Sequence, residues 1–255
     1  MKILTCSALQ AAPHVTLYHT GPALDHGPLP TIFYFTLAGP DSLTVDPYNQ
    51  PVQFLSDQRI RFFSLTLPAH ENGLSPHNAL SVWAEDMTKG IDIFSDFLDA
   101  AELAVEFTIR QKLVDPNKLA VAGLSRGAFF ASHLAARDKR FRFILQFAPL
   151  TKLEKTKEFQ DMTHHQIVES LDLFALAPQI ADRHIRFYIG NRDTRVDTKS
   201  CIDFAMHLVE SGKSRSPSIE LIMSPSIGQY GHGTSPETFR QGAMWLADCL
   251  KERSK

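Results

Sequence analysis

Short apolar runs alternate along most of the chain with longer stretches that have helical spacing. Dense β-branched and aromatic residues predict strands at residues 31–37, 61–67, 119–124, 141–147, 184–189 and 218–223. Apolar residues recurring at helical spacing, or runs of small residues, predict helices at 79–86, 91–114, 128–137, 198–210 and 236–252. Ser235 before Pro236 is typical of a helix start. The stretch 39–51, rich in Pro, Asp and Asn, is expected to be a loop.

This alternation predicts a three-layer α/β fold, in which a mostly parallel sheet carries helices on both faces. Active sites in such sheets lie at the carboxyl ends of the strands. The length of 255 residues fits a single domain covering residues 1–255. Residues 151–180 differ in composition, because they are charged at first and then amphipathic. We interpret this segment either as a small cap over the site or as ordinary connecting helices.

Charge and cysteine content narrow the class of protein. The formal net charge is −2 with both signs mixed, so nucleic acid is not an expected partner. No apolar stretch is long enough to span a bilayer, and polar residues interrupt the N-terminal segment, so no signal peptide is expected. Cys6, Cys201 and Cys249 lie far apart and are odd in number, which fits reduced thiols in the cytoplasm. The histidine spacings do not suggest a zinc site, so no metal is expected.

The most informative motif is the pentapeptide Gly123-Leu124-Ser125-Arg126-Gly127, between a predicted strand and a predicted helix. A serine on a sharp strand-to-helix turn, with a glycine two residues away on each side, is a nucleophile-elbow arrangement. A Cβ at either glycine would collide with the neighbouring strand or helix at this strained turn. The pattern occurs by chance in roughly one chain in ten of this length, so the flanking strand and helix matter. We therefore predict Ser125 as the nucleophile.

A serine hydroxyl needs a base within hydrogen-bond reach, and the base needs an acid to orient it. In elbow folds the acid and then the histidine follow the serine along the chain. His232, between two glycines in the loop after the last strand, is the predicted base, and turnover should fail below about pH 6.5 if it must be neutral. Asp193, just past strand 184–189, is the preferred acid. Asp197 is the alternative, although its simplest role is a helix N-cap.

Two backbone amides are expected to hold the oxyanion of an acyl-transfer reaction. One is the amide of Arg126, directly after the nucleophile. The other should come from the loop after strand 31–37, where Pro40 has no N–H. In this loop Gly39 is favoured over Asp41. The Arg126 side chain is expected to pair with an acid or to face water, rather than to contact an anionic group of a substrate.

With these motifs the chain resembles the α/β-hydrolase superfamily, and within it small hydrolases allied to the prolyl-oligopeptidase and dienelactone-hydrolase branch. The matching residues are the elbow 123–127, the acid turn 190–196 and the Gly-His-Gly sequence 231–233. The resemblance covers the chain from about residue 30 to its end, with a less assignable stretch at 151–180. It implies a mainly parallel sheet of eight strands and Ser125, Asp193 and His232 as a catalytic triad.

The chain also departs from these relatives. Ser125 stands where dienelactone hydrolases have cysteine, and Ala128 follows Gly127 where oligopeptidases commonly have a second glycine. Only about thirty residues precede the first strong strand, so we expect no β-propeller domain that would restrict substrate size. We therefore expect a serine hydrolase that cleaves small-molecule carboxylic esters without a cofactor. The alternatives are a serine peptidase or acyltransferase on the same triad, and a non-catalytic binding protein that keeps the fold.

Overall fold

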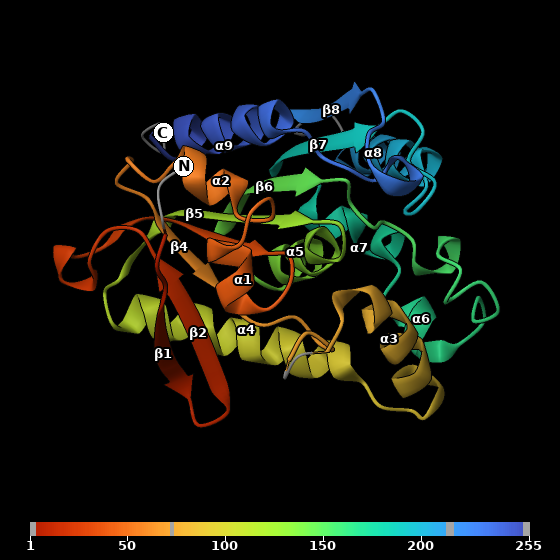
Figure 1. Ribbon diagram of the computed structural model, residues 1–255, viewed down its shortest axis with the longest axis horizontal. Helices are drawn as coiled ribbons and strands as arrows, with labels where there is room; N and C mark the ends of the chain where they lie inside the picture. The colour runs from red at the N-terminus through yellow and green to blue at the C-terminus, as the bar shows by residue number, and fades with distance from the viewer. Residues whose placement is uncertain (1–3, 72–73, 213–216, 252–255) are drawn as a thin grey trace.

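The computed structural model describes residues 4–71, 74–212 and 217–251 of the chain. An eight-stranded sheet with the order β1-β2-β4-β3-β5-β6-β7-β8 lies at its centre (Figure 1). The strands are β1 (Ser7–Ala12), β2 (Val15–Thr20), β3 (Leu29–Phe35), β4 (Arg61–Ser64), β5 (Val114–Leu124), β6 (Phe141–Phe147), β7 (His184–Gly190) and β8 (Ile219–Ser224). The β1–β2 and β2–β4 pairs are antiparallel, and all other neighbouring strands run parallel. The carboxyl ends of β3 and of β5 to β8 therefore lie at one edge of the sheet.

Helices connect these strands and cover both faces of the sheet. They are α1 (Gly39–Thr44), α2 (Gln50–Phe54), α3 (Ala79–Thr88), α4 (Ile93–Arg110), α5 (Arg126–Arg137), α6 (Gln166–Ser170), α7 (Leu173–Ile180), α8 (Thr198–Gly212) and α9 (Pro236–Lys251). Figure 1 shows α9 and α2 on one side of the sheet and α4 on the other. The predicted α/β fold with helices on both faces is confirmed.

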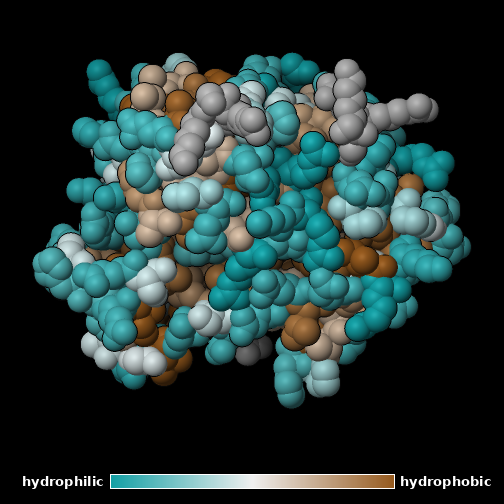
Figure 2. Space-filling model, turned by 180° about the vertical axis from the view of Figure 1, so that it is seen from behind, coloured by the Kyte–Doolittle hydropathy of each residue, from teal (hydrophilic) through white to brown (hydrophobic). Residues whose placement is uncertain are grey.

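The core divides into two layers because successive side chains of a strand point to opposite faces of the sheet. On β3, Phe33 and Phe35 are buried in the layer that includes α4 and α5. Ile32 and Tyr34, at the alternating positions, are buried in the layer that includes α2 and α9. On the face drawn in Figure 2, hydrophilic side chains cover most of the surface and hydrophobic ones appear in separate spots. Burial on both faces explains why the parallel strands are continuous apolar runs rather than alternating ones.

All six predicted strands form, and their bounds differ from the predicted ones by a few residues. The five predicted helices also form, although the one predicted at 91–114 ends at Arg110 and its last residue already belongs to β5. The end of the helix predicted at 236–252 lies outside the described residues. The prediction of a loop at 39–51 is wrong, because α1 and the start of α2 lie there. Proline in the first turn of each helix explains this, since a helix tolerates proline at that position.

The antiparallel hairpin of β1 and β2 was not predicted from the sequence. Val15 and Leu17 of β2 are buried and alternate with half-buried polar positions, so a period of two was present in this segment. β1 has no such signal, because it is an edge strand of mainly small and polar residues, none of which is fully buried. Its pairing with β2 is a tertiary result rather than a local preference.

His133 is a buried histidine on α5, and its burial is expected to make the stability of the fold depend on pH. His133 on α5 is 6% exposed, and its ring packs against Phe129 with 4.7 Å between the ring centroids. Burial lowers the pKa of His133 from 6.5 to about 3, and the positive charge of Arg137 adds to this effect while the backbone at Leu171 opposes it. In the unfolded chain His133 is therefore protonated below about pH 6.5, whereas in the folded protein it is protonated only below about pH 3.

Stability is therefore expected to fall as the pH drops from about 6.5 towards 3, because the unfolded state then holds more protons. The loss from His133 alone should be on the order of 3 kcal/mol at pH 4. Urea unfolding between pH 7 and pH 4 should show a shallower pH slope for His133→Gln than for the wild type. The control is His164→Gln, because the His164 side chain is 95% exposed. Equal slopes in all three proteins would contradict the assignment.

Candidate active site

Ser125 lies on a tight turn between β5 and α5 and has a strained backbone. Its φ of 55° and ψ of −114° are rare for a residue with a side chain. The turn is held from β6, because the Ser125 amide donates to the carbonyl of Phe147 at 2.8 Å and the Leu150 amide donates to the carbonyl of Ser125 at 3.2 Å. These contacts hold Ser125 at the carboxyl edge of the sheet, in the strand-to-helix turn that the sequence motif predicts.

The two glycines of the elbow are required by close backbone contacts. A Cβ at Gly127 would overlap the carbonyl of Phe35 at the end of β3. A Cβ at Gly123 would overlap the backbone of Gly127 and the amide of Ala128 at the start of α5. The expected collisions with the neighbouring strand and helix are thus confirmed. The glycines allow helix, turn and strand to pack closely around the serine.

His232 reaches the serine from the loop between β8 and α9. The loop is closed by the amide of Gly233, which donates to the carbonyl of Ile227 at 2.8 Å. Gly231 has a φ of 70°, and a Cβ there would overlap the carbonyl of Arg192 in the acid turn. Nε2 of His232 lies 2.9 Å from the hydroxyl of Ser125. Gly231 therefore lets this loop approach the turn after β7 closely, and Gly233 lets the loop close on Ile227.

Asp193 joins this hydrogen-bond chain from the carboxyl end of β7. Its Oδ2 lies 2.7 Å from Nδ1 of His232. Its Oδ1 accepts from the amides of Arg195 at 2.9 Å and Val196 at 3.1 Å. Because a carboxylate only accepts, Nδ1 of His232 donates to it, and Nε2 of the neutral ring is left to accept the proton of Ser125. Asp193 is 2% exposed, so its orientation is set by the protein and not by solvent.

Asp197, the alternative acid, has a different role. Its Oδ2 accepts from the amide of Ser200 at 3.1 Å and from the Ser200 hydroxyl at 2.5 Å, just after the start of α8. This is the N-cap arrangement that its place before a helix suggests. The structure therefore brings Ser125, His232 and Asp193 together and leaves Asp197 outside the group.

The two amides predicted for an oxyanion site differ in their availability. The Arg126 amide is in the first turn of α5 and has no acceptor among the hydrogen bonds of the described residues. The Gly39 amide donates to Oγ1 of Thr66 at 3.0 Å. Gly39 therefore does not offer a free donor, and the structure does not support the prediction of Gly39. Local sequence could not reveal this bond, because Thr66 lies in the segment after β4.

Ala38, the residue before Gly39, is the better candidate for the second donor. The preceding amides of Thr36 and Leu37 both donate to the hydroxyl of Ser42, at 3.2 and 3.0 Å. In the part of the chain that the structure describes, the Ala38 amide has no such partner. The approach of β3 to Gly127 places this loop beside the elbow.

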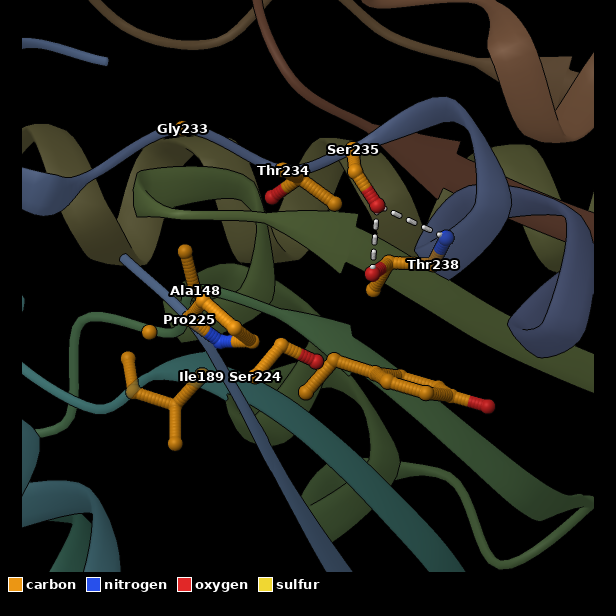
Figure 3. Close-up of a pocket in the computed structure, with 10 residues that line it drawn as sticks. Ala148, Ile189, Ser224, Pro225, Gly233, Thr234, Ser235 and Thr238 are labelled. Carbon is orange, nitrogen blue, oxygen red and sulfur yellow. Dashed lines mark hydrogen bonds between the residues drawn. The ribbon is translucent and has the colours of Figure 1, made fainter. Parts of the chain in front are cut away.

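A small pocket lies next to this group at the ends of β6, β7 and β8 (Figure 3). Its lining includes Ala148, Ser224 and Thr234, and the start of α9 closes one side. There the Ser235 hydroxyl accepts from the amide of Thr238 at 3.1 Å, so Ser235 is the helix start that the sequence predicts. Neither Ser125 nor His232 lines the pocket. The pocket is therefore a neighbour of the hydrogen-bonded group and not the place of a reacting carbonyl.

The Arg126 side chain binds a backbone carbonyl rather than the acid or solvent that its sequence context predicts. It is partly buried, and its Nη1 donates to the carbonyl of Pro76 at 2.5 Å. Among the described residues it forms no ion pair with a carboxylate. Burial lowers the pKa of Arg126 to about 10, and the positive charge of Arg195 adds to the shift. The guanidinium therefore remains charged at neutral pH without a carboxylate partner.

Residues 151–180, which were interpreted as a cap or as connecting helices, begin beyond the carboxyl end of β6. α7 packs on α5 and α8, and Leu173 and Ile180 are buried in the core. The earlier part of the segment contacts the turn that carries Asp193. There Nη1 and Nη2 of Arg195 donate to the two carboxylate oxygens of Glu158 at 2.9 and 3.0 Å, which makes a bidentate ion pair. Burial opposes ionisation of Glu158, but the hydrogen bonds and charge of Arg195, a backbone hydrogen bond and the charge of Lys157 together lower the pKa of Glu158.

The described residues show neither a metal-binding cluster nor a membrane-spanning helix. Within residues 4–71, 74–212 and 217–251, no group of three or more His, Cys, Asp or Glu side chains could hold a metal ion. Over the same residues, none of the helices has the length and apolar character that crossing a membrane requires.

The sheet order and the elbow between β5 and α5 define an α/β-hydrolase. Residues 82–253, more than half of the chain, match the model of the prolyl oligopeptidase family. The chain therefore belongs to the prolyl oligopeptidase family and is a hydrolase. No curated protein matches its sequence significantly.

Solved structures support the same fold. A cold-adapted esterase from an Arctic intertidal metagenomic library is 19% identical, with a TM-score of 0.68 over 96% of this chain and 93% of the esterase. The protein TT1662 from Thermus thermophilus is 17% identical, with a TM-score of 0.72 over 99% and 100% of the two chains. Pyrococcus horikoshii acylaminoacyl peptidase is 14% identical, with a TM-score of 0.70, and this chain covers 43% of it. At these identities the matches show the fold alone.

Proposed function

We propose that the protein is a serine esterase that cleaves small-molecule carboxylic esters through an acyl-enzyme intermediate. The observation that carries the proposal is the continuous hydrogen-bond chain from the Ser125 hydroxyl through His232 to Asp193. A serine, a histidine and a buried carboxylate in this order are the parts that nucleophilic acyl transfer needs. The strained φ of Ser125 is a second support, because such strain concentrates at functional sites.

In the proposed reaction, Nε2 of His232 takes the proton of Ser125 as the serine oxygen attacks the ester carbonyl. The oxyanion accepts hydrogen bonds from the amide of Arg126 and, in our proposal, from the amide of Ala38. His232 then gives its proton to the leaving alcohol. Water attacks the acyl-serine through the same base and releases the acid. Asp193 holds the tautomer of His232 and stabilises its cation.

The buried carboxylate, the glycine-flanked histidine and the free amide all come from the protein itself, so the proposed chemistry uses no cofactor. Cys6, Cys201 and Cys249 form no disulfide, which supports our proposal that the protein works in the reducing cytoplasm.

A peptidase or an acyltransferase would use the same residues. We favour esters because an esterase neighbour shares the fold over 96% of this chain and 93% of its own length. p-Nitrophenyl acetate should therefore be hydrolysed, and a peptide p-nitroanilide should be left intact by the same enzyme concentration. Faster release from the peptide would support a peptidase, and transfer to an added alcohol would support an acyltransferase. A native protein that neither hydrolyses the ester nor forms a fluorophosphonate adduct would be a binding protein with the hydrolase fold.

A further inference from the structure

Arg126, the residue after the nucleophile, has a guanidinium that forms no direct ion pair with a carboxylate in the described part of the chain. Arg126 follows Ser125 directly, and its Nη1 donates to the Pro76 carbonyl at 2.5 Å. A carbonyl oxygen accepts a hydrogen bond but does not neutralise the charge. Burying a cation without a directly paired anion costs free energy, so a binding role for the guanidinium is worth testing.

Two carboxylates on this side of the site, Glu158 and Asp193, already have other hydrogen-bond donors. Glu158 is 5% exposed at its side chain and accepts two hydrogen bonds from Arg195. Asp193 accepts from His232 and from two backbone amides. Neither carboxylate forms a direct ion pair with Arg126, although the negative charge of Glu158 acts on the guanidinium and opposes the lowering of the Arg126 pKa. The two positive charges of Arg126 and Arg195 face two negative charges, but Arg195 takes the direct ion pair with Glu158, so Arg126 is the guanidinium without one.

His70 lies close enough to Arg126 for the charge of the guanidinium to affect its pKa. It is 6% exposed, and its Nδ1 lies 2.9 Å from the Pro68 carbonyl, so Nδ1 carries the proton. Its Nε2 is buried and has no hydrogen-bond partner within the described part of the chain. Burial and then the charge of Arg126 lower the pKa of His70 to about 4, so His70 is neutral at pH 7.

We infer that Arg126 recognises an anionic group of the substrate, so that the preferred esters carry a carboxylate near the scissile bond. This inference rests on the proposed esterase function. A guanidinium has five N–H donors in a planar fork, and within residues 4–71, 74–212 and 217–251 only the bond to Pro76 uses one of those on Arg126. A carboxylate can accept two of them side by side. Arg126 is half-buried as a residue, and its guanidinium must lie within reach of the bound ester for this contact to form.

The test compares matched esters that differ in one charge. Monoethyl succinate and monoethyl glutarate place the carboxylate on the acyl side, and acetoxyacetate places it on the alcohol side. Their diethyl esters and ethyl acetoxyacetate are the neutral partners. The ratio of kcat/KM for the charged ester to that for its neutral partner should fall about 10- to 100-fold in Arg126→Gln in at least one arm, because a charge-assisted contact is lost. Arg126→Lys should recover part of it, because the charge returns without the fork.

Arg137→Gln is the matched control on the same helix, because Arg137 pairs with Asp99 at the surface. It should leave the ratio unchanged. A purely structural role of Arg126 in holding Pro76 would change both members of each ester pair alike, and an unchanged ratio in both arms would overturn the inference.

A binding measurement separates this inference from the proposed function. Calorimetric titrations of Ser125→Ala with monoethyl glutarate and with acetoxyacetate should show, for at least one of the two esters, binding that is weakened at least about 10-fold in the Ser125→Ala, Arg126→Gln double variant. Equal or absent binding of both esters in both variants would overturn the inference even if neutral esters are hydrolysed. Loss of ester turnover and of fluorophosphonate labelling in the wild type, with charge-dependent binding kept, would overturn the proposed function alone.

Discussion

Ser125→Ala is expected to lower ester turnover on the order of 10⁴-fold or more and to abolish labelling by a fluorophosphonate. The reason is that Ser125 Oγ is the atom that His232 Nε2 contacts at 2.9 Å. Alanine removes the nucleophile but keeps the elbow, because the backbone contacts to Phe147 and Leu150 involve main-chain atoms. The measurements are hydrolysis of p-nitrophenyl acetate and intact-mass detection of the adduct.

The control for Ser125→Ala is another serine of the same region. Ser235 caps α9 close to His232, so Ser235→Ala should cost about 1 kcal/mol of stability and keep both labelling and turnover. Circular dichroism at neutral pH should show that both variants are folded. A fluorophosphonate adduct on folded Ser125→Ala would exclude Ser125 as the nucleophile.

Asp193→Asn is expected to lower turnover on the order of 10⁴-fold, the effect known for this substitution in other serine triads. An asparagine can offer its N–H₂ to Nδ1 of His232, and the ring then carries its proton on Nε2. Nε2 could no longer accept the proton of Ser125. The fold should be kept, because asparagine has the same shape and its oxygen can still accept from the amides of Arg195 and Val196.

Asp197→Asn is the matched control, four residues further along the same turn. Asparagine is a good N-cap, so the contact with Ser200 at the start of α8 should be largely retained. Turnover should stay within a few-fold of the wild type. The kcat values of both variants with p-nitrophenyl acetate decide between the two acids, and a larger loss in Asp197→Asn than in Asp193→Asn would reverse the assignment.

The nucleophile turn was predictable because its signals are local. An apolar strand, two glycines around a serine and a helix-forming run lie within about twenty consecutive residues. Gly123 and Gly127 report a backbone crowding that any residue with a Cβ would violate. Asp197 was also interpretable, because an N-cap depends only on the first turn of its own helix.

Other parts of the site depend on residues from distant segments. The Gly39 amide was predicted as a donor on local grounds, and Thr66, after a different strand, accepts its hydrogen bond. The surroundings of Arg126 come from Pro76, Glu158 and Arg195, which lie on three separate loops. Sequence patterns do not report which loop packs against which, so these two predictions required the structure.

The sequence alone determined the α/β class, most of the helices and strands, and the three side chains proposed for the reaction, because periodicity, glycine placement and chain order are properties of neighbouring residues. Only the tertiary structure decided that His232 lies within 2.9 Å of Ser125 across 107 positions of chain, and which amides and charges remain free around them. Parallel packing of β5, β7 and β8 brings the ends of these strands to one edge. The contacts between their loops then depend on side-chain packing over the whole domain, which no local pattern contains.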